Sequence, residues 1–233
     1  MENRGILIAI EGLDGCGKQT QSQLLKENLE KLGYKVRLVS APYYGKWHCQ
    51  FVEKQLDGYF GTNVKEVNPY MASNFYAIDR LGAYIEDWKD DYDNGVIILC
   101  DRYVGSNMMY QSAKLDNEEE KLELMRWIGK LEYDINGLPS PDLNIFLSVK
   151  PETSEELRKN RLNKATGGET QDIYESNLEF LKDTYKNSTF VADLLDWKIV
   201  ECDTNGTMRS IEDISKEILT VVKNHVKLEQ DSL

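Results

Sequence analysis

The stretch IAIEGLDGCGKQTQSQLL, residues 8–25, decides the fold, because it leads from a short apolar run through closely spaced glycines into a helical pattern. Residues 12–18 match the pattern G-x-x-x-x-G-K, in which backbone N–H groups surround phosphate oxygens and the lysine adds a positive charge. The alternative is a glycine-rich turn with a solvated lysine, but the flanking strand and helix patterns favour a phosphate-binding loop. The sequence therefore predicts a nucleotide site.

Gln19 stands where this pattern normally has a hydroxyl group that coordinates Mg²⁺. Thr20 is no direct substitute, because one step along a helix rotates the side chain by about 100°. The loop itself does not depend on Gln19, since backbone amides form it. Mg²⁺ binds oxygen atoms and keeps several waters, and a carboxylate beside phosphates is repelled unless a cation lies between them. Asp14 is therefore the expected metal partner.

Five short apolar runs, rich in β-branched residues, predict buried strands of a parallel sheet. These runs span residues 6–10, 36–40, 96–100, 143–149 and 198–202. Helical periodicity occupies residues 18–32, 69–88, 118–133, 153–162, 173–195 and 211–226. The alternation predicts an α/β fold with a doubly wound, five-stranded parallel sheet flanked by helices.

The chain is long enough for one domain with a sizeable core, which we expect over residues 1–226. A polar, Gly/Thr-rich segment between two predicted helices, residues 164–172, is typical of a mobile flap. We therefore expect a lid at about residues 160–173 and a flexible tail over residues 227–233.

Composition and charge argue against several classes of protein. The 28 Lys and Arg residues against 40 Asp and Glu residues give a formal net charge of −12, which disfavours broad association with nucleic acids or anionic membranes. No apolar run is long enough to span a bilayer or to form a signal-peptide core. The four cysteines are scattered, which argues against a zinc site or a disulfide framework. We expect a cytoplasmic protein.

A motif after the third apolar run predicts a second binding site beside the loop. Asp101 and Arg102 follow that run, so Arg102 could bridge two phosphate groups at the carboxyl edge of the sheet. Asn107, Tyr110 and Gln111 then recur at helical spacing and form one polar face that could read a base edge. The alternative for Asp101 and Arg102 is a surface ion pair.

Two aromatic stretches extend this second site. Tyr76 and Arg80 lie four residues apart on a predicted helix, so one could stack on a base while the other donates hydrogen bonds to it. The alternative is that the aromatic residues pack in the core, as we expect for Phe75 and Tyr84 rather than for Tyr76. In SAPYYGKW, after the second apolar run, the hydroxyl of Tyr44 could reach a phosphate.

Taken in order and spacing, EGLDGCGKQTQ, PYYG, FYAIDR and DRYVGSNMMYQ resemble the thymidylate kinase family of P-loop nucleoside-monophosphate kinases over nearly the whole chain. The resemblance implies a P-loop NTPase fold with a short lid, transfer of the γ-phosphoryl group of ATP to dTMP in dTTP biosynthesis, Mg²⁺ as cofactor, and a homodimer. It implies Lys18, Arg102 and Asp14 as catalytic residues.

The resemblance also implies roles on the dTMP side. Tyr76 would stack on thymine, Arg80 and Asn107 would hydrogen-bond its edge, and Tyr110 would crowd the sugar 2′ position. Arg102 and Tyr44 would hold the acceptor phosphate, and Asp14 would lie near the sugar 3′-hydroxyl and the metal. The complete implied set is Asp14, Tyr44, Tyr76, Arg80, Arg102, Asn107, Tyr110 and Gln111.

On the ATP side, the implied contacts are Gly12, Asp14, Gly15, Cys16, Gly17, Lys18, Gln19, Thr20, Arg158 and Arg161. Some members of the family carry an arginine within the loop. This loop has none, so the candidates for the donor-side cation are Arg158, Arg161 and Lys164. Glu175 matches the glutamate that follows the flap, and it would support the metal together with Asp14, through water.

Two other classes stay open at this point. A deoxynucleoside kinase would phosphorylate a 5′-hydroxyl and needs a carboxylate base after the second strand, where SAPYYG has no acid. A non-catalytic P-loop switch or regulatory ATPase would need no second pocket, and the polar residues of the second site would then have only structural roles.

Overall fold

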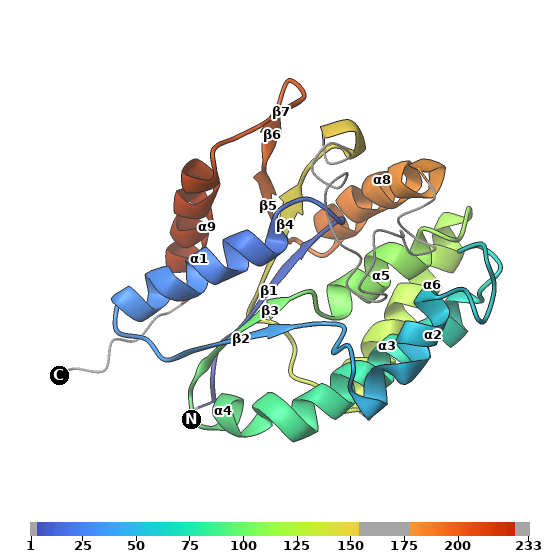
Figure 1. Ribbon diagram of the computed structural model, residues 1–233, viewed down its shortest axis with the longest axis horizontal. Coiled ribbons are helices and arrows are strands. Elements are labelled where there is room, and N and C mark those ends of the chain that lie inside the picture. The colour runs from blue at the N-terminus through green and yellow to red at the C-terminus, as the bar shows by residue number, and fades with distance from the viewer. Residues whose placement is uncertain (1–3, 154–177, 227–233) are drawn as a thin grey trace.

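A five-stranded sheet forms the centre of the structure, a computed structural model that describes residues 4–153 and 178–226 (Figure 1). The strands stand in the order β2-β3-β1-β4-β5, and every neighbouring pair is parallel. Their bounds are Leu7–Gly12 for β1, Val36–Ser40 for β2, Ile97–Asp101 for β3, Leu143–Ser148 for β4 and Lys198–Glu201 for β5. Each strand lies within two residues of the run that predicts it, so the predicted doubly wound fold is confirmed.

β1 lies between β3 and β4, and its side chains are buried on both faces. Leu7 and Ala9 face one layer of helices. Ile8 and Ile10 face the other layer. A strand covered on both sides needs apolar residues at consecutive positions, which explains its continuous apolar run. Because β3 pairs with β1, the carboxyl end of β3 brings Arg102 beside the phosphate-binding loop, as predicted.

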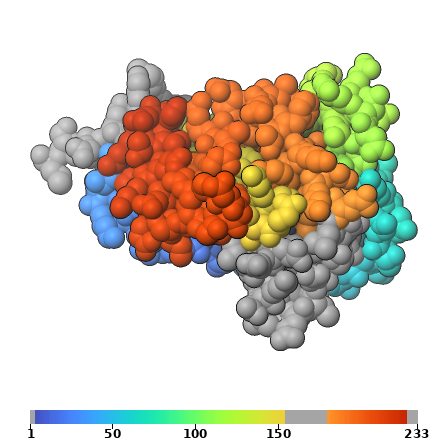
Figure 2. All heavy atoms as spheres, turned by 90° about the horizontal axis from the view of Figure 1, so that it is seen from above, coloured from blue at the N-terminus to red at the C-terminus, as the bar shows by residue number. Residues whose placement is uncertain are grey.

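Helices cover the sheet in two layers (Figure 1). On the side of Ile8 lie α1 (Lys18–Lys31) and α9 (Ile211–His225). On the side of Leu7 lie α3 (Pro69–Ala83), α5 (Val104–Ser112), α6 (Glu118–Gly129) and α8 (Leu178–Leu194). Figure 2 shows α8 and the segment from β6 to α9 as adjacent areas of one surface. The two layers bury the sheet and leave its carboxyl edge to the connecting loops.

Two predicted helices are not continuous α-helices. After α3, the helix predicted over residues 69–88 ends in a π-helical turn, η2 (Tyr84–Trp88), and α4 (Lys89–Asp93) follows. After α6, the helix predicted over residues 118–133 ends in a second π-helical turn, η3 (Lys130–Ile135). A π turn closes its hydrogen bonds over five residues instead of four, so it rotates the side chains that follow away from α-helical spacing.

Several short elements were not predicted. They are η1 (Trp47–Cys49), α2 (Gln50–Leu56), and the two strands of a hairpin, β6 (Asp203–Thr204) and β7 (Thr207–Met208). Each is too short to show a hydrophobic period, which is the signal that the sequence analysis depends on. α2 nevertheless contributes Leu56 to the site described below.

Most of the predicted helix 153–162, the lid at 160–173 and the tail at 227–233 lie outside the described residues. The helix predicted over residues 173–195 is described from Leu178, where α8 begins. Within residues 4–153 and 178–226, no helix combines the length and the apolar character needed to cross a bilayer.

Candidate active site

The phosphate-binding loop connects the carboxyl end of β1 to the first turn of α1. Two of its glycines are required by geometry. A Cβ at Gly12 would lie 2.6 Å from the Sγ of Cys16, and Gly17 has a φ of 88°, in the left-handed region, where it caps α1. Without side chains at these positions, the backbone turns tightly and directs the N–H groups that begin α1 toward one point.

Lys18 lies within this loop and is buried. Its Nζ donates a hydrogen bond to the carbonyl oxygen of Leu13 at 2.6 Å and lies 3.7 Å from the Sγ of Cys16. The side chain therefore bends back over the loop instead of extending into solvent. This geometry contradicts the alternative of a glycine-rich turn with a solvated lysine.

A cleft beside the loop, here called the loop cleft, contains most of the predicted ATP contacts. Its lining residues are Asp14, Gly15, Cys16, Gly17, Lys18, Gln19, Thr20, Gln21, Ser40, Ala41, Asp101, Arg102, Met208, Arg209, Ile211 and Ile214. Gly12 lies just before them at the end of β1. Met208 ends the unpredicted hairpin and Arg209 follows it, and no sequence signal marked them. Arg209 also pairs with Glu217 at 2.7 Å.

A second cleft, here called the helix cleft, lies between α3, α5 and the loop after β2. Its lining residues are Asp14, Ala41, Pro42, Tyr44, Leu56, Tyr76, Arg80, Arg102, Ser106, Asn107, Tyr110 and Gln111. All of the residues that the sequence analysis assigns to the second site are among them. They come from four separate stretches of the chain, which meet because their strands end at the same edge of the sheet.

Asp14 and Arg102 line both clefts, so they stand where the clefts meet. Arg102 Nη2 donates to Asp14 Oδ1 at 2.6 Å, and its Nη1 lies 3.2 Å from the carbonyl oxygen of Gly12. The hydroxyl of Tyr110 donates to the other carboxylate oxygen of Asp14 at 2.9 Å. Arg102 therefore pairs with Asp14, and the alternative of a surface ion pair with Asp101 is wrong.

The charges at this junction are held in their ionised forms. Burial alone would raise the pKa of Asp14, but Arg102 and Lys18 outweigh it and bring that pKa below its usual range. Burial would lower the pKa of Arg102, yet Asp14 and neighbouring groups raise it well above its usual value. Arg102 also adopts a φ of 72°, which is costly for a residue with a Cβ. The junction thus combines fixed charges with a strained backbone.

Glu11, near the end of β1, contacts the start of α5 next to the junction, and the sequence analysis did not predict this role. It is fully buried, and its carboxylate accepts hydrogen bonds from the N–H of Tyr103 at 3.0 Å and from the hydroxyl of Ser106 at 2.5 Å. Burial raises the pKa of Glu11 above its ordinary value, although the hydrogen bonds and Arg102 oppose that shift. These contacts fix the start of α5 against the phosphate-binding loop. An acidic residue directly after an apolar run was the available signal.

The aromatic residues of α3 divide as expected. Phe75 is buried, stacks with Phe51 at a centroid distance of 5.2 Å and packs against the tilted ring of Phe60 at 4.9 Å, while Tyr84, at the start of η2, packs on Trp88. Tyr76 instead lines the helix cleft. The expectation that Phe75 and Tyr84 belong to the core is therefore confirmed.

Arg80 and Asn107 line the helix cleft, but each also contacts a residue that the sequence analysis missed. Glu132, on η3, accepts hydrogen bonds from Nε and Nη2 of Arg80 at 2.5 Å each and from Nδ2 of Asn107 at 3.0 Å. The predicted helix places Glu132 on the same face as the buried Leu124 and Ile128, but nothing in its local sequence pairs it with Arg80 or Asn107. The π turn of η3 is a feature that local periodicity does not reveal.

Four predicted residues cannot be compared with the structure. Arg158, Arg161, Lys164 and Glu175 lie outside the described residues.

Comparison with known proteins identifies relatives over most of the chain. The family profile for thymidylate kinase matches residues 10–218. Thymidylate kinase of Mycobacterium tuberculosis is 32% identical over 182 residues, which cover 77% of this chain and 82% of that protein. Thymidylate kinase of Schizosaccharomyces pombe is 29% identical over 224 residues, covering 96% and 94%. The solved structure of thymidylate kinase from Candida albicans has a TM-score of 0.68 and 22% identity, covering 95% of this chain and 92% of that one, which shows a common fold.

Proposed function

Because the chain belongs to the thymidylate kinase family, we propose that Lys18, Arg102 and Asp14 carry out its transfer of a phosphoryl group to dTMP. The enzyme phosphorylates dTMP to dTDP in dTTP biosynthesis, with ATP as the donor. The observation that supports these roles is that Asp14 and Arg102 line both clefts and form a 2.6 Å ion pair between them. Donor and acceptor phosphates would meet at that point.

Catalysis would rest on positioning and charge rather than on a base. The acceptor phosphate is largely dianionic near neutral pH, so no group needs to remove a proton before in-line attack. Lys18 and the loop amides would hold the phosphates of ATP, and Arg102 would extend toward the acceptor and neutralise the shared charge. The lid at about residues 160–173 would close over the site and exclude water, which limits hydrolysis of ATP.

In the helix cleft, Tyr76 would stack on thymine while Arg80 and Asn107 hydrogen-bond its edge, with Gln111 nearby. Tyr44 and Arg102 would hold the phosphate of dTMP. Tyr110 donates its hydroxyl to Asp14, so its ring is fixed where it would crowd a ribose 2′-hydroxyl and favour deoxyribose.

The ATP contacts would be the loop residues together with Arg158 and Arg161. The full loop set is Gly12, Asp14, Gly15, Cys16, Gly17, Lys18, Gln19 and Thr20.

We also propose Mg²⁺ as the cofactor, held through water by Asp14 and Glu175. Carboxylate oxygen is a ligand that Mg²⁺ accepts, and the low pKa of Asp14 keeps it anionic. In the described part of the chain no group of three His, Cys, Asp or Glu side chains is placed to hold a metal alone. When bound, the ion would neutralise phosphate charge.

An ADP-release assay with Mg²⁺ and separate acceptors tests the reaction. We expect strong activity with dTMP, weaker activity with dUMP, and none with AMP or thymidine, because the helix cleft provides phosphate-binding groups and side chains that could hydrogen-bond a pyrimidine edge. Removal of divalent metal with EDTA should abolish turnover. Activity on thymidine alone would instead identify a nucleoside kinase, and ADP release independent of every acceptor would identify an ATPase.

We further propose that one domain, residues 1–226, acts as a cytoplasmic homodimer without nucleic-acid or membrane partners. Large apolar side chains on α3 and its neighbours have exposed fractions between 37% and 63%. They are Trp47, Phe51, Met71, Ile78 and Ile85. Met71 and Ile78 lie seven residues apart and therefore on one face of α3. Such a stripe on a surface favours a contact with a second copy.

Substitution of Ile78 by glutamate should convert the dimer to a monomer, because an uncompensated charge would enter an apolar contact. Sedimentation velocity measures the change. Leu194→Glu is the matched control, since Leu194 is 49% exposed on α8, and that variant should stay dimeric. A wild-type chain that sediments as a monomer, or an Ile78→Glu variant that remains a dimer, would contradict this interface.

A further inference from the structure

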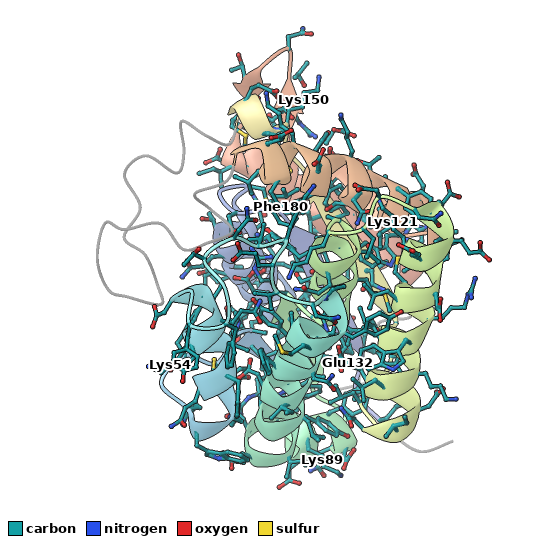
Figure 3. The ribbon with its side chains drawn as sticks, turned by 90° about the vertical axis from the view of Figure 1, so that its right-hand side faces the viewer. Lys54, Lys89, Lys121, Glu132, Lys150 and Phe180 are labelled. Carbon is teal, nitrogen blue, oxygen red and sulfur yellow. The ribbon has the colours of Figure 1, made fainter. Side chains whose placement is uncertain are left out.

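Glu132 is a fully buried carboxylate that lies among the helices (Figure 3), and it is not one of the residues that line the helix cleft. It stands on η3, in the interior next to α3. Its Oε2 accepts from Arg80 Nε, and its Oε1 accepts from both Arg80 Nη2 and Asn107 Nδ2. One carboxylate therefore contacts both residues assigned to the base edge.

Arg80 is oriented by this contact. Its guanidinium is planar, and the edge formed by Nε and Nη2 is used completely by the two 2.5 Å hydrogen bonds to Glu132. Rotation about the side chain would break both bonds in a buried site. The pair leaves the N–H groups of Nη1 and the second N–H of Nη2, so Arg80 can offer only donors to a ligand in the helix cleft.

Asn107 is oriented in the same way. Its Nδ2 donates to Glu132 Oε1 at 3.0 Å and to the carbonyl oxygen of Ser73 at 3.2 Å. A flipped amide would place Oδ1 against two acceptor oxygens, so Oδ1 must face away from them. Oδ1 is buried and has no hydrogen-bond partner among the described residues, while Asn107 lines the helix cleft. Oδ1 therefore lacks the donor that it needs, and an N–H group of a ligand in the cleft would supply it.

A donor from Arg80 beside an acceptor from Asn107 matches only one kind of pyrimidine edge. Thymine and uracil carry a carbonyl oxygen at C4, which accepts, next to an N3–H group, which donates. Cytosine reverses this pattern, because its C4 amino group donates and its unprotonated N3 accepts. The pattern that Glu132 imposes therefore fits thymine and opposes cytosine.

We propose that Glu132 is the positioning residue that sets this donor–acceptor pattern and so makes the enzyme reject cytosine nucleotides. The inference rests on the proposed contacts of Arg80 and Asn107 with the base. Stability alone does not explain the arrangement, since a buried ion pair is often no more stable than an apolar pair of similar volume.

The variant Glu132→Gln tests the pattern without changing side-chain size. Glutamine brings an NH₂ group to a position where a carboxylate oxygen accepted from Arg80 or Asn107, so a donor would face a donor. Relief requires Asn107 to flip or Arg80 to move. A flip would present an NH₂ group to the cleft, where it suits N3 of cytosine.

The measurement is the ratio of kcat/KM for dTMP to kcat/KM for 5-methyl-dCMP, which differ only at the N3 and C4 edge. Both values come from one preparation, so a loss of folded enzyme cancels in the ratio. Glu132→Gln should lower the ratio by about tenfold or more, because a buried hydrogen-bonding group is left unpaired. Asp142→Asn is the matched control, since Asp142 also accepts two hydrogen bonds from an arginine and one from an N–H group, at the opposite edge of the sheet. Its ratio should not change.

A second variant keeps a carboxylate opposite Arg80, so the test does not depend on whether Glu132→Gln folds. Glu132→Asp retains the charge but withdraws it by one carbon, and it should lower the same ratio by about threefold or more. An unchanged ratio in both Glu132 variants, with a lowered ratio in Asn107→Ala, would overturn the role of Glu132 alone. An unchanged ratio in Asn107→Ala and in both Glu132 variants would overturn the proposed base contacts themselves, and with them this inference.

Discussion

Arg102→Met should lower kcat by about 10³-fold, with a much smaller change in KM for ATP. A fixed cation that stabilises charge on a transferring phosphoryl group contributes rate enhancements of this size. Arg102 lines both clefts, and Asp14 fixes its guanidinium before substrate arrives. Methionine keeps most of the side-chain length, so the loss reports the charge and the hydrogen bonds rather than the packing.

Two further variants make the result specific. Arg102→Lys restores the charge without the planar fork, and it should recover only part of the rate, because a lysine cannot contact Asp14 and a phosphate through two edges at once. Arg37→Met removes an arginine near the start of β2 that pairs with Asp87 and Asp91 and lines neither cleft, and its kcat should equal that of the wild type within about twofold. If Arg102→Met kept more than about a tenth of the wild-type kcat, Arg102 would be a structural partner of Asp14 and not a catalytic residue.

The fold was predictable because the strands of a doubly covered parallel sheet must be apolar at consecutive positions. In β1 this requirement is met by Leu7, Ile8, Ala9 and Ile10, and it can be read from the sequence without tertiary information. The meeting of the motifs was predictable for a related reason. The carboxyl ends of parallel strands lie at one edge, so motifs that follow different strands converge there.

The residues that hold the site in place were not predictable in this way. Glu132 is 52 residues from Arg80 in the chain, so no local pattern pairs the two side chains. Arg209 reaches the loop cleft from a hairpin of four paired residues, which leaves no periodic pattern. Glu11 was visible as an acid directly after an apolar run, but its partners Tyr103 and Ser106 lie over 90 positions away. Pairing between such residues depends on packing rather than on local sequence.

Lys18 lines the loop cleft and not the helix cleft, so its substitution should affect ATP and dTMP differently. Lys18→Met should therefore reduce kcat/KM for ATP by about 10³-fold, through loss of the one ammonium group enclosed by the loop. The affinity for dTMP, measured by calorimetry without ATP, should stay within about threefold of the wild type.

A matched substitution on the same helix controls for the helix itself. Lys26 pairs with Glu30 on α1, two turns beyond Lys18, and Lys26→Met should change neither turnover nor dTMP binding, since such a surface pair contributes little. Loss of dTMP binding in Lys18→Met would mean that the two clefts are not independent. Retained turnover would be the more serious result, because the phosphates of ATP would then be held without the lysine around which the loop is folded.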